Sequence, residues 1–294
     1  MNCLSRFKVD WANRFYGRRL SSLEELFGVS KPIIGMVHLP PLPGAPAYGG
    51  ESIDYIVDFA LKEASALIEG GVDGLIVENM WDLPYYVGKN VPPEEIAVQA
   101  VAAREVVKFS SVPVGVNVVH NGGRVTLAIA KAAGAKFIRV CLLTGALVWD
   151  TGELDHGCAA ELLRARKMLY AEDIRIFADV CKKHAVMFPG IDLRTHAIWC
   201  DFYMADALIV TGTMTGVPPK VEDVIEVKKA ASERPVLLGS GVNISNVKTF
   251  LKYADGAIVG TYFKVNGITQ NPVDVERVKK FMRIVKEIRK ATMQ

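Results

Sequence analysis

Short apolar runs alternate with longer amphipathic segments along most of this chain. Eight of the runs are rich in valine and isoleucine and are mostly continuous, which is typical of strands buried on both faces of a parallel sheet. These predicted strands span residues 32–38, 72–78, 112–119, 136–142, 174–180, 207–211, 235–239 and 256–260. Helical patterns follow them near residues 52–69, 93–108, 122–133, 158–171, 194–204, 220–232, 244–253 and 273–291.

This alternation predicts an α/β fold, and eight strand–helix units favour a closed (β/α)8 TIM barrel. An open doubly wound sheet would need a glycine fingerprint after its first strand, and prolines stand there instead. Because no linker or low-complexity tract is visible, we expect one barrel domain over residues 31–294, preceded by an N-terminal extension over residues 1–30. Residues 21–24 resemble a capping box and predict a short helix that ends near Phe27.

The composition excludes several classes of protein but does not identify the function. The 294 residues are 50% hydrophobic, and the net charge is only +3 with no basic tract, so nucleic acid is not expected as a partner. The five cysteines form no C-x-x-C pair, which argues against a disulfide framework or a zinc ribbon. Neither a signal peptide nor an apolar membrane span is visible, so we expect a soluble, cytoplasmic homo-oligomer, with peripheral contact to a membrane complex left open.

Two glycine-bearing segments near the C-terminus carry most of the functional signal. Residues 235–243 and 255–262 each predict a strand that ends in glycine and leads into a helix. Glycine lets the backbone approach a ligand, and the N–H groups that follow can bind an anion. At the ends of the last two barrel strands, this arrangement is the usual phosphate site of the fold. We therefore expect a small phosphorylated substrate, against the alternative that the glycines serve only tight turns; the phosphate-binding candidates are Gly239, Ser240, Gly241, Gly260 and Thr261.

A specific motif lies at the first predicted strand, Pro32-Ile-Ile-Gly-Met-Val-His-Leu-Pro-Pro-Leu-Pro-Gly44. Further motifs are Asp73-Gly-Leu-Ile-Val-Glu-Asn79, Phe137-Ile-Arg-Val140, Glu161-Leu-Leu-Arg164, Ile176-Phe-Ala-Asp-Val180, Lys183-His-Ala185 and Asp206-Ala-Leu-Ile-Val-Thr-Gly-Thr213. With these, the chain from about residue 21 onward resembles the BtpA family, named for a protein implicated in photosystem I biogenesis. The resemblance implies a barrel of the ribulose-phosphate-binding type and brings no settled reaction. Departures from the family pattern at residues 120–122, 141–143 and Cys181 imply an altered substrate pocket.

Polar residues at the ends of the predicted strands are the catalytic candidates, because the inside of a barrel is otherwise packed with side chains. His38 ends the first strand and is a candidate general acid or base, or else a hydrogen-bonded histidine beneath the proline-rich loop. Glu78 and Asp179 end the second and fifth strands and need partners if they are buried. Arg139, within the fourth strand, is their expected partner, either in a structural ion pair or as a group that holds a substrate anion.

Other polar residues follow the same strands and are candidates for substrate binding. They are Asn79, Asn117, His120, His184, Thr211 and Thr213. Lys183 is either functional or part of a solvated loop, and Lys264 either reaches the anion or lies on a helix surface. Each of these signals is weak when taken alone.

The chain offers no pattern for a bound cofactor, and we expect neither cofactor nor metal. No apolar strand run carries a lysine in its middle or at its C-terminal end, which disfavours a Schiff-base aldolase. No dinucleotide fingerprint is present. A metal would need ligands from several strands, such as His38, Glu78 and Asp179, and that alternative stays open.

Two functions from different classes follow from these patterns. In the first, the protein is an enzyme of the isomerase or lyase type that acts on a small phosphorylated metabolite, such as a sugar or nucleoside phosphate. In the second, which the family resemblance implies, it is a non-catalytic biogenesis or stability factor for a membrane protein complex. The proline-rich segment over residues 39–51 would then be the docking contact, rather than a stiff wall over the barrel mouth.

Overall fold

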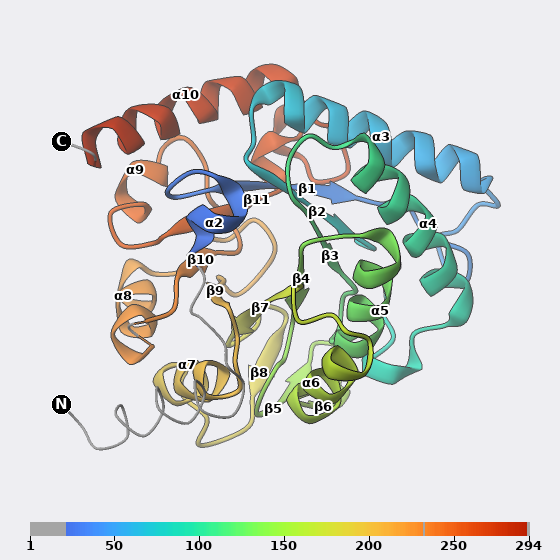
Figure 1. The fold of residues 1–294 in the computed structure, drawn as a ribbon, viewed down its shortest axis with the longest axis horizontal. Helices are drawn as coiled ribbons and strands as arrows, with labels where there is room; N and C mark the ends of the chain where they lie inside the picture. The colour runs from blue at the N-terminus through green and yellow to red at the C-terminus, as the bar shows by residue number, and fades with distance from the viewer. Residues whose placement is uncertain (1–21, 232, 293–294) are drawn as a thin grey trace.

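The computed structural model describes residues 22–231 and 233–292, and eight parallel strands close into a barrel there (Figure 1). Around the barrel, the strand order is β1-β11-β10-β9-β7-β4-β3-β2. The strands are β1 (Ile33–His38), β2 (Gly74–Glu78), β3 (Val114–Asn117), β4 (Phe137–Val140), β7 (Arg175–Val180), β9 (Ala207–Val210), β10 (Val236–Leu238) and β11 (Gly256–Val259). Each lies within one of the eight predicted runs, so the predicted (β/α)8 fold is confirmed.

Helices follow the strands along the chain and surround the barrel (Figure 1). They are α3 (Ile53–Gly70), α4 (Pro93–Phe109), α5 (Gly123–Ala133), α6 (Ala159–Met168), α7 (Leu193–Phe202), α8 (Val221–Ala230), α9 (Val247–Phe250) and α10 (Val275–Thr292). The prediction for residues 244–253 was too long, because α9 has only four residues. Asn246 Oδ1 accepts from Asn243 N and Asn243 Oδ1 accepts from Ser245 N, and such local side-chain bonds compete with a regular helical start.

The short helix α2 (Leu23–Phe27) closes the amino-terminal end of the barrel, where it lies across the near end in Figure 1. The Ser22 side chain accepts from Glu25 N, and Gly28 ends the helix with a φ of 72°. Ser21, where the predicted capping box began, lies outside the described residues. Phe27 packs against the inward-facing Phe137 and Phe177, with ring centroids 5.6 and 6.4 Å away, so apolar packing fills this end of the barrel.

A small antiparallel sheet that the sequence did not predict stands at the opposite end. Its strands are β5 (Ala146–Trp149), β6 (Leu154–His156) and β8 (Ala185–Met187), in the order β6-β5-β8. They are only three or four residues long, so their pattern is too short to identify a strand, although Leu147 and Trp149 of β5 are buried. Because β5 follows β4 and β8 follows β7, the sheet joins the two long loops above those strands.

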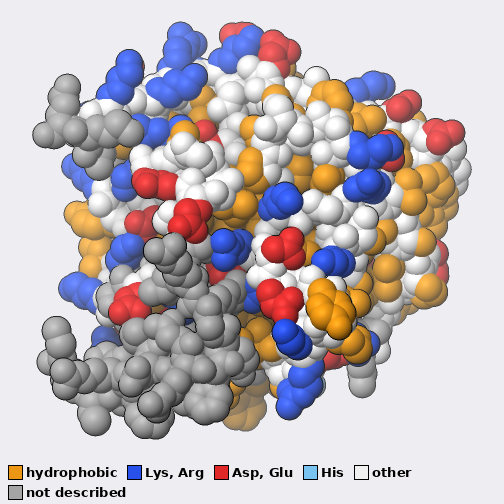
Figure 2. Space-filling model, viewed as in Figure 1, with side chains coloured by type: hydrophobic (Ala, Val, Ile, Leu, Met, Phe, Trp, Pro, Cys, Tyr) orange, Lys and Arg blue, Asp and Glu red, His pale blue; other side chains and the backbone are white. Residues whose placement is uncertain are grey.

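The outer surface mixes charges of both signs. On the face seen in Figure 2, Lys and Arg side chains are interspersed with Asp and Glu. Among the described residues, no helix has the length and apolar character that a membrane span requires. Short 3-10 turns complete the described elements: η1 (Gly88–Asn90), η2 (Thr261–Phe263) and η3 (Val265–Gly267).

A buried ion pair ties the segment after β11 to α3. Lys264 is only 1% exposed, and its Nζ donates to Glu63, which is 3% exposed and also accepts from Val273 N at 2.8 Å. Burial lowers the pKa of Lys264, and the Glu63 carboxylate opposes this shift. Both alternatives that the sequence allowed for Lys264, an anion ligand and a helix-surface lysine, were therefore wrong.

Replacing one member of this pair should destabilise the fold strongly. We expect Lys264→Met to lower the free energy of unfolding by about 3–5 kcal/mol, because it leaves a buried carboxylate without its cation. The double variant Glu63→Gln/Lys264→Met should recover most of that loss, because no charge is then buried. The matched control is Lys279→Met, which breaks an exposed pair with Glu69 and should cost less than about 1 kcal/mol. Urea unfolding followed by circular dichroism measures all three; equal losses for Lys264→Met and Lys279→Met would contradict the assignment.

Candidate active site

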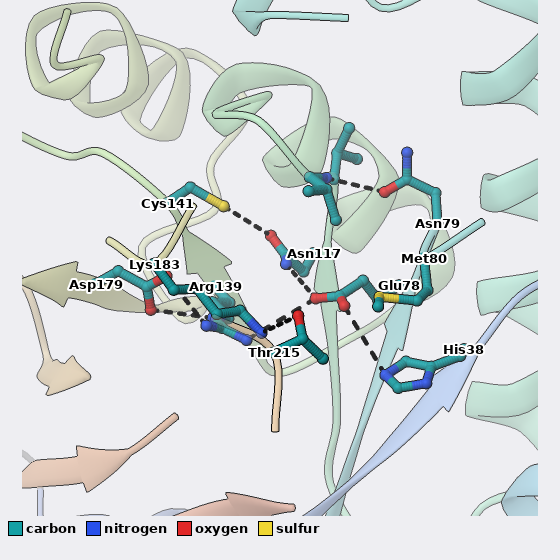
Figure 3. Close-up of polar contacts among 12 residues, drawn as sticks. His38, Glu78, Asn79, Met80, Asn117, Arg139, Cys141, Asp179, Lys183 and Thr215 are labelled. Carbon is teal, nitrogen blue, oxygen red and sulfur yellow. Dashed lines mark hydrogen bonds and ion pairs between the residues drawn. The ribbon is translucent and has the colours of Figure 1, made fainter. Parts of the chain in front are cut away.

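Side chains from four strands meet at the carboxyl end of the barrel. His38 ends β1, Glu78 ends β2, Arg139 lies on β4 and Asp179 on β7. The Arg139 guanidinium donates two hydrogen bonds to Asp179, from Nε to Oδ1 and from Nη2 to Oδ2, both at 3.0 Å (Figure 3). Its Nη1 lies 3.9 Å from Glu78 Oε2. Arg139 therefore pairs with both carboxylates that the sequence proposed as its partners.

Glu78 is held here as an ionised carboxylate. Asn117, at the end of β3, donates from Nδ2 to Glu78 Oε2, and His38 Nε2 lies 3.9 Å from Oε1 (Figure 3). Burial by itself would raise the pKa of Glu78, but the Arg139 guanidinium and other nearby cations outweigh burial and lower it. Because Glu78 also lines the cavity at the barrel mouth, it can accept a proton from a bound molecule.

Asp179 has a different part. It is fully buried, and its oxygens are occupied by Arg139 and by Lys182, whose Nζ lies 2.5 Å from Oδ2. Burial would raise its pKa, but these two cations outweigh burial and lower it. Since Asp179 lines neither of the two cavities described below, its role is to fix Arg139 in place.

His38 is buried as a neutral imidazole. Desolvation, followed by the positive charge of Lys264, lowers its pKa to about 3, although Glu78 acts in the opposite sense. Its Nδ1 has no hydrogen-bond partner among the described residues. The sequence proposed His38 as an acid or base titrating near neutrality; in this environment it instead offers a neutral ring that can donate or accept a hydrogen bond.

The two glycine turns line one cavity, of about 210 Å³, at the carboxyl end of the barrel. All five predicted phosphate residues border it, together with His38, Glu78 and Arg139. Within the described part of the chain, the N–H groups of Gly241, Val242, Thr261 and Tyr262 donate to no protein acceptor. Backbone donors from two turns around one cavity form the arrangement that binds anions in many proteins.

The glycines also meet steric demands. A methyl group at Gly241 would lie 2.1 Å from Pro218 N, and the φ of this residue is +65°, so the close approach of the loop after β9 requires glycine there. A methyl group at Gly260 would lie 3.1 Å from His38 Cε1. The Ser240 hydroxyl accepts from Gly212 N at 2.9 Å and donates to Val217 O at 2.7 Å, so it anchors the same loop.

A cation that the sequence analysis missed stands beside the second turn. Arg277, in the first turn of α10, lines the cavity. Its Nε donates to Tyr262 O at 2.8 Å, and its guanidinium carbon lies 4.5 Å from the centre of the Tyr262 ring. The only sequence signal for it is its position early in the helix after the last barrel strand, which was too general to single it out. Its charge complements an anion bound by the backbone donors.

A second cavity, of about 440 Å³, adjoins the first. The two share five lining residues, Glu78, Met80, Arg139, Lys183 and Thr215, so they are the two ends of one site. Apolar and aromatic side chains line much of the second end, among them Leu83, Tyr85 and Val119. The site therefore combines an end suited to anions with a wider end suited to an apolar or ring-shaped group.

Both predicted substrate-binding histidines, His120 and His184, line the second cavity. The His120 ring stacks on Trp149 with centroids 4.0 Å apart, and burial lowers its pKa to about 4. His184 lies 3.1 Å from Asp150 through Nδ1, and its Nε2 accepts from Thr215 N at 3.1 Å. Desolvation lowers the pKa of His184, with Lys183 as the next cause.

Other predicted binding residues serve the framework of the site and line neither cavity. Asn79 donates to Asp82 and accepts from Val119 N, which links the loops after β2 and β3. Thr211 Oγ1 accepts from Lys183 N at 3.1 Å. Thr213 offers its carbonyl to His184 N and exposes its side chain.

Lys183 lines both cavities, and its Nζ donates to Thr215 Oγ1 at 3.1 Å. Of the two alternatives left by the sequence, the solvated loop was wrong.

His38, Glu78 and Asp179 do not assemble as a metal site. Within the described ranges, no group of three or more His, Cys, Asp or Glu side chains is placed to hold a metal ion.

Comparison with known proteins identifies the family. The sequence model of the BtpA family matches residues 29–287. The chain belongs to the BtpA family. An uncharacterized protein of Pyrococcus furiosus is 43% identical over 262 residues, which cover 89% of this chain and 97% of that protein. The photosystem I biogenesis protein BtpA of Synechocystis is 38% identical over 266 residues, covering 90% of this chain and 91% of that protein.

Solved structures share the barrel of this BtpA-family protein at low sequence identity. N-(5'-phosphoribosyl)anthranilate isomerase from Pyrococcus furiosus superposes with a TM-score of 0.52 and 15% identity, covering 87% of this chain and 99% of that one. Tryptophan synthase from M. tuberculosis gives a TM-score of 0.55 and 17% identity, covering 88% of this chain and 93% of that one. At these identities the likeness establishes the fold alone.

The neutral state of His38 has a measurable effect on stability. The pKa of His38 is about 3 in the folded protein and 6.5 in the unfolded chain. Below pH 6.5 the unfolded chain therefore binds a proton at His38 that the folded protein does not bind. Stability from this residue is complete above pH 6.5 and is lost as the pH falls toward 3, by about 1.4 kcal/mol per pH unit. We expect His38→Gln to lose less stability than the wild type between pH 6.5 and 5 in urea titrations. Equal losses would show that His38 is protonated in the folded protein.

Proposed function

We propose that this protein is an enzyme that binds a small phosphorylated metabolite, such as a sugar or nucleoside phosphate, and catalyses an isomerase or lyase reaction by proton transfer. One observation carries the proposal. The backbone donors of both glycine turns and the Arg277 guanidinium surround the same cavity as Glu78, His38 and Arg139. A phosphate bound at the turns would hold the rest of the molecule against those three side chains.

The charge state of each group suggests its part in the reaction. Glu78 is ionised, so it is the candidate general base. His38 is neutral and can hydrogen-bond to a substrate oxygen, and a neutral imidazole is an effective donor to a developing oxyanion. Arg139 stays charged because of its two carboxylates, and it can counter negative charge that develops on the substrate.

The alternative role as a biogenesis factor for a membrane complex is supported by the name of the Synechocystis relative. The barrel mouth argues for the enzyme instead, because it is hollow and lined with charged groups. The proline-rich segment packs inward: Leu39 and Leu42 are fully buried, and Leu42 N donates to Asp82 at 2.8 Å. This packing argues against a docking arm, and no residue of the segment lines either cavity.

Arg277 provides a test of phosphate binding. We expect ribose 5-phosphate to bind the wild type, ribose to bind far more weakly, and Arg277→Met to weaken ribose 5-phosphate by about tenfold or more, because a charge-assisted contact is lost. Arg283→Met, which removes an exposed arginine from the same helix, is the matched control and should bind as the wild type does. Isothermal titration calorimetry gives all four affinities.

Two results would count against the proposed function. One is equal binding of ribose and ribose 5-phosphate by the wild type, because phosphate would then contribute nothing. The other is an equal effect of Arg277→Met and Arg283→Met, because the loss of affinity would then reflect the protein's overall charge and not a contact beside the glycine turns.

A further inference from the structure

Lys183 stands where the two ends of the site meet. It borders the phosphate-suited cavity and the wider, apolar cavity, and Thr215, its hydrogen-bond partner at 3.1 Å, borders both as well. Figure 3 shows its side chain beside Arg139 and Thr215 at the carboxyl end of β4 and β7. Any molecule that extends from the glycine turns into the wider cavity passes this amine.

The backbone after β7 aims Lys183 inward. Two non-glycine residues there adopt left-handed conformations, Cys181 with a φ of 51° and His184 with a φ of 61°. Such conformations carry strain and concentrate at functional sites. Lys183 N donates to Thr211 Oγ1 at 3.1 Å and His184 N to Thr213 O at 3.0 Å, so bonds to the loop after β9 hold this turn.

The neighbouring lysine has a different environment. Lys182 Nζ lies 2.5 Å from Asp179 Oδ2 and is tied to that carboxylate. In contrast, among the described residues Lys183 Nζ hydrogen-bonds only to a neutral hydroxyl, that of Thr215. Lys183 is thus the lysine whose amine is available to a ligand in both cavities.

The surroundings also favour the neutral amine, which is the nucleophilic form. Burial, followed by the charges of Lys182 and Arg139, lowers the pKa of Lys183 to about 7, while Glu78 and Asp179 oppose the shift. At that pKa about half of the amine is unprotonated at neutral pH, against less than about a thousandth for an ordinary lysine. Lysines activated in this way form imines with carbonyl substrates.

We propose that Lys183 is a catalytic residue that forms an imine with the carbonyl carbon of a phosphorylated aldehyde or ketone bound at the glycine turns. This inference rests on the proposed function and names its substrate class. It runs against the expectation from the sequence, which disfavoured Schiff-base chemistry because no predicted strand carries a lysine in its middle or at its C-terminal end. The lysine is instead placed by the turn that follows one.

The step balances without any co-reactant. The neutral Lys183 amine adds to the carbonyl carbon and forms a C–N bond, and a proton moves from nitrogen to oxygen to give a carbinolamine. Loss of the hydroxyl group as water, with one proton from solvent, leaves a protonated imine. The protonated imine accepts the electron pair released when Glu78 removes a proton from the carbon next to the imine carbon, or when a C–C bond to that neighbouring carbon breaks, and an enamine forms, as isomerase and lyase reactions require.

Reductive trapping tests the proposal. The wild type is incubated with glycolaldehyde phosphate or dihydroxyacetone phosphate at neutral pH, sodium borohydride is added, and modified lysines are located by peptide mass spectrometry. We expect Lys183 to be labelled at least about tenfold more than the exposed Lys167, because a far larger fraction of its amine is neutral. Inorganic phosphate should reduce the labelling of Lys183 and leave that of Lys167 unchanged.

Variants separate the nucleophile from its surroundings. Lys183→Arg keeps a cation in the site and Lys183→Met removes it; both should lose the dominant label. Lys167→Met is the matched control and should keep it. Calorimetry with ribose 5-phosphate on the same Lys183 variants shows whether the glycine turns are intact.

Each remaining outcome overturns a defined part of the argument. If ribose 5-phosphate binds but Lys183 is labelled no more than Lys167, the imine is wrong and the proposed function stands. If unphosphorylated glycolaldehyde labels Lys183 equally and inorganic phosphate does not compete, the assignment to a phosphorylated substrate is wrong. If the wild type neither binds the phosphate ester nor is trapped, both proposals fall.

Discussion

The pairing of Arg139 with Asp179 is the interaction on which the barrel mouth depends. A buried guanidinium and a fully buried carboxylate each lose their hydration, which costs free energy. Two parallel hydrogen bonds at 3.0 Å offset much of that desolvation cost. The pair spans adjacent strands, β4 and β7, so the register of the barrel fixes the position of Arg139. From that position Arg139 reaches Glu78 on β2 and keeps it ionised inside a low-polarity environment. Without Arg139, Asp179 would keep Lys182 as its partner, but Glu78 would lose the cation that lowers its pKa most.

The same arrangement makes the site predominantly positive at the end near the glycine turns. Cations from separate elements border the joined cavities: Arg139 from β4, Lys183 from the turn after β7 and Arg277 from α10. Glu78 is the one carboxylate among the described residues that borders the end near the glycine turns. An anionic substrate would therefore be attracted to that end, and the apolar lining around Tyr85 and Val119 would favour a less polar group at the other.

Much of the fold could be predicted from the sequence because buried parallel strands leave continuous apolar runs, and the barrel follows from their number and spacing. His38, Glu78 and Arg139 could be singled out because a polar residue within or at the end of an apolar run is costly to bury unless it has a partner or a function. Other parts depend on tertiary geometry that leaves no local pattern. Arg277 reaches the cavity only because α10 begins beside the turn after β11, and the strands β5, β6 and β8 are too short to show a hydrophobic period. Lys264 was not expected to be buried, because its partner Glu63 is 201 positions away and no local sequence pattern indicates the pairing.

The contact between Gly260 and His38 places the proposed anion site next to the proposed catalytic side chains. The His38 ring lies so close to the second glycine turn that a methyl group on Gly260 would approach Cε1 to 3.1 Å. The turn that offers free N–H groups to an anion is therefore also the wall that sets where the imidazole can lie, and His38 in turn lies 3.9 Å from Glu78. A side chain at position 260 would have to displace the ring toward Glu78 or push the turn away from the cavity. Either movement would disturb Glu78 and the backbone donors together, which gives a steric reason for glycine at this position.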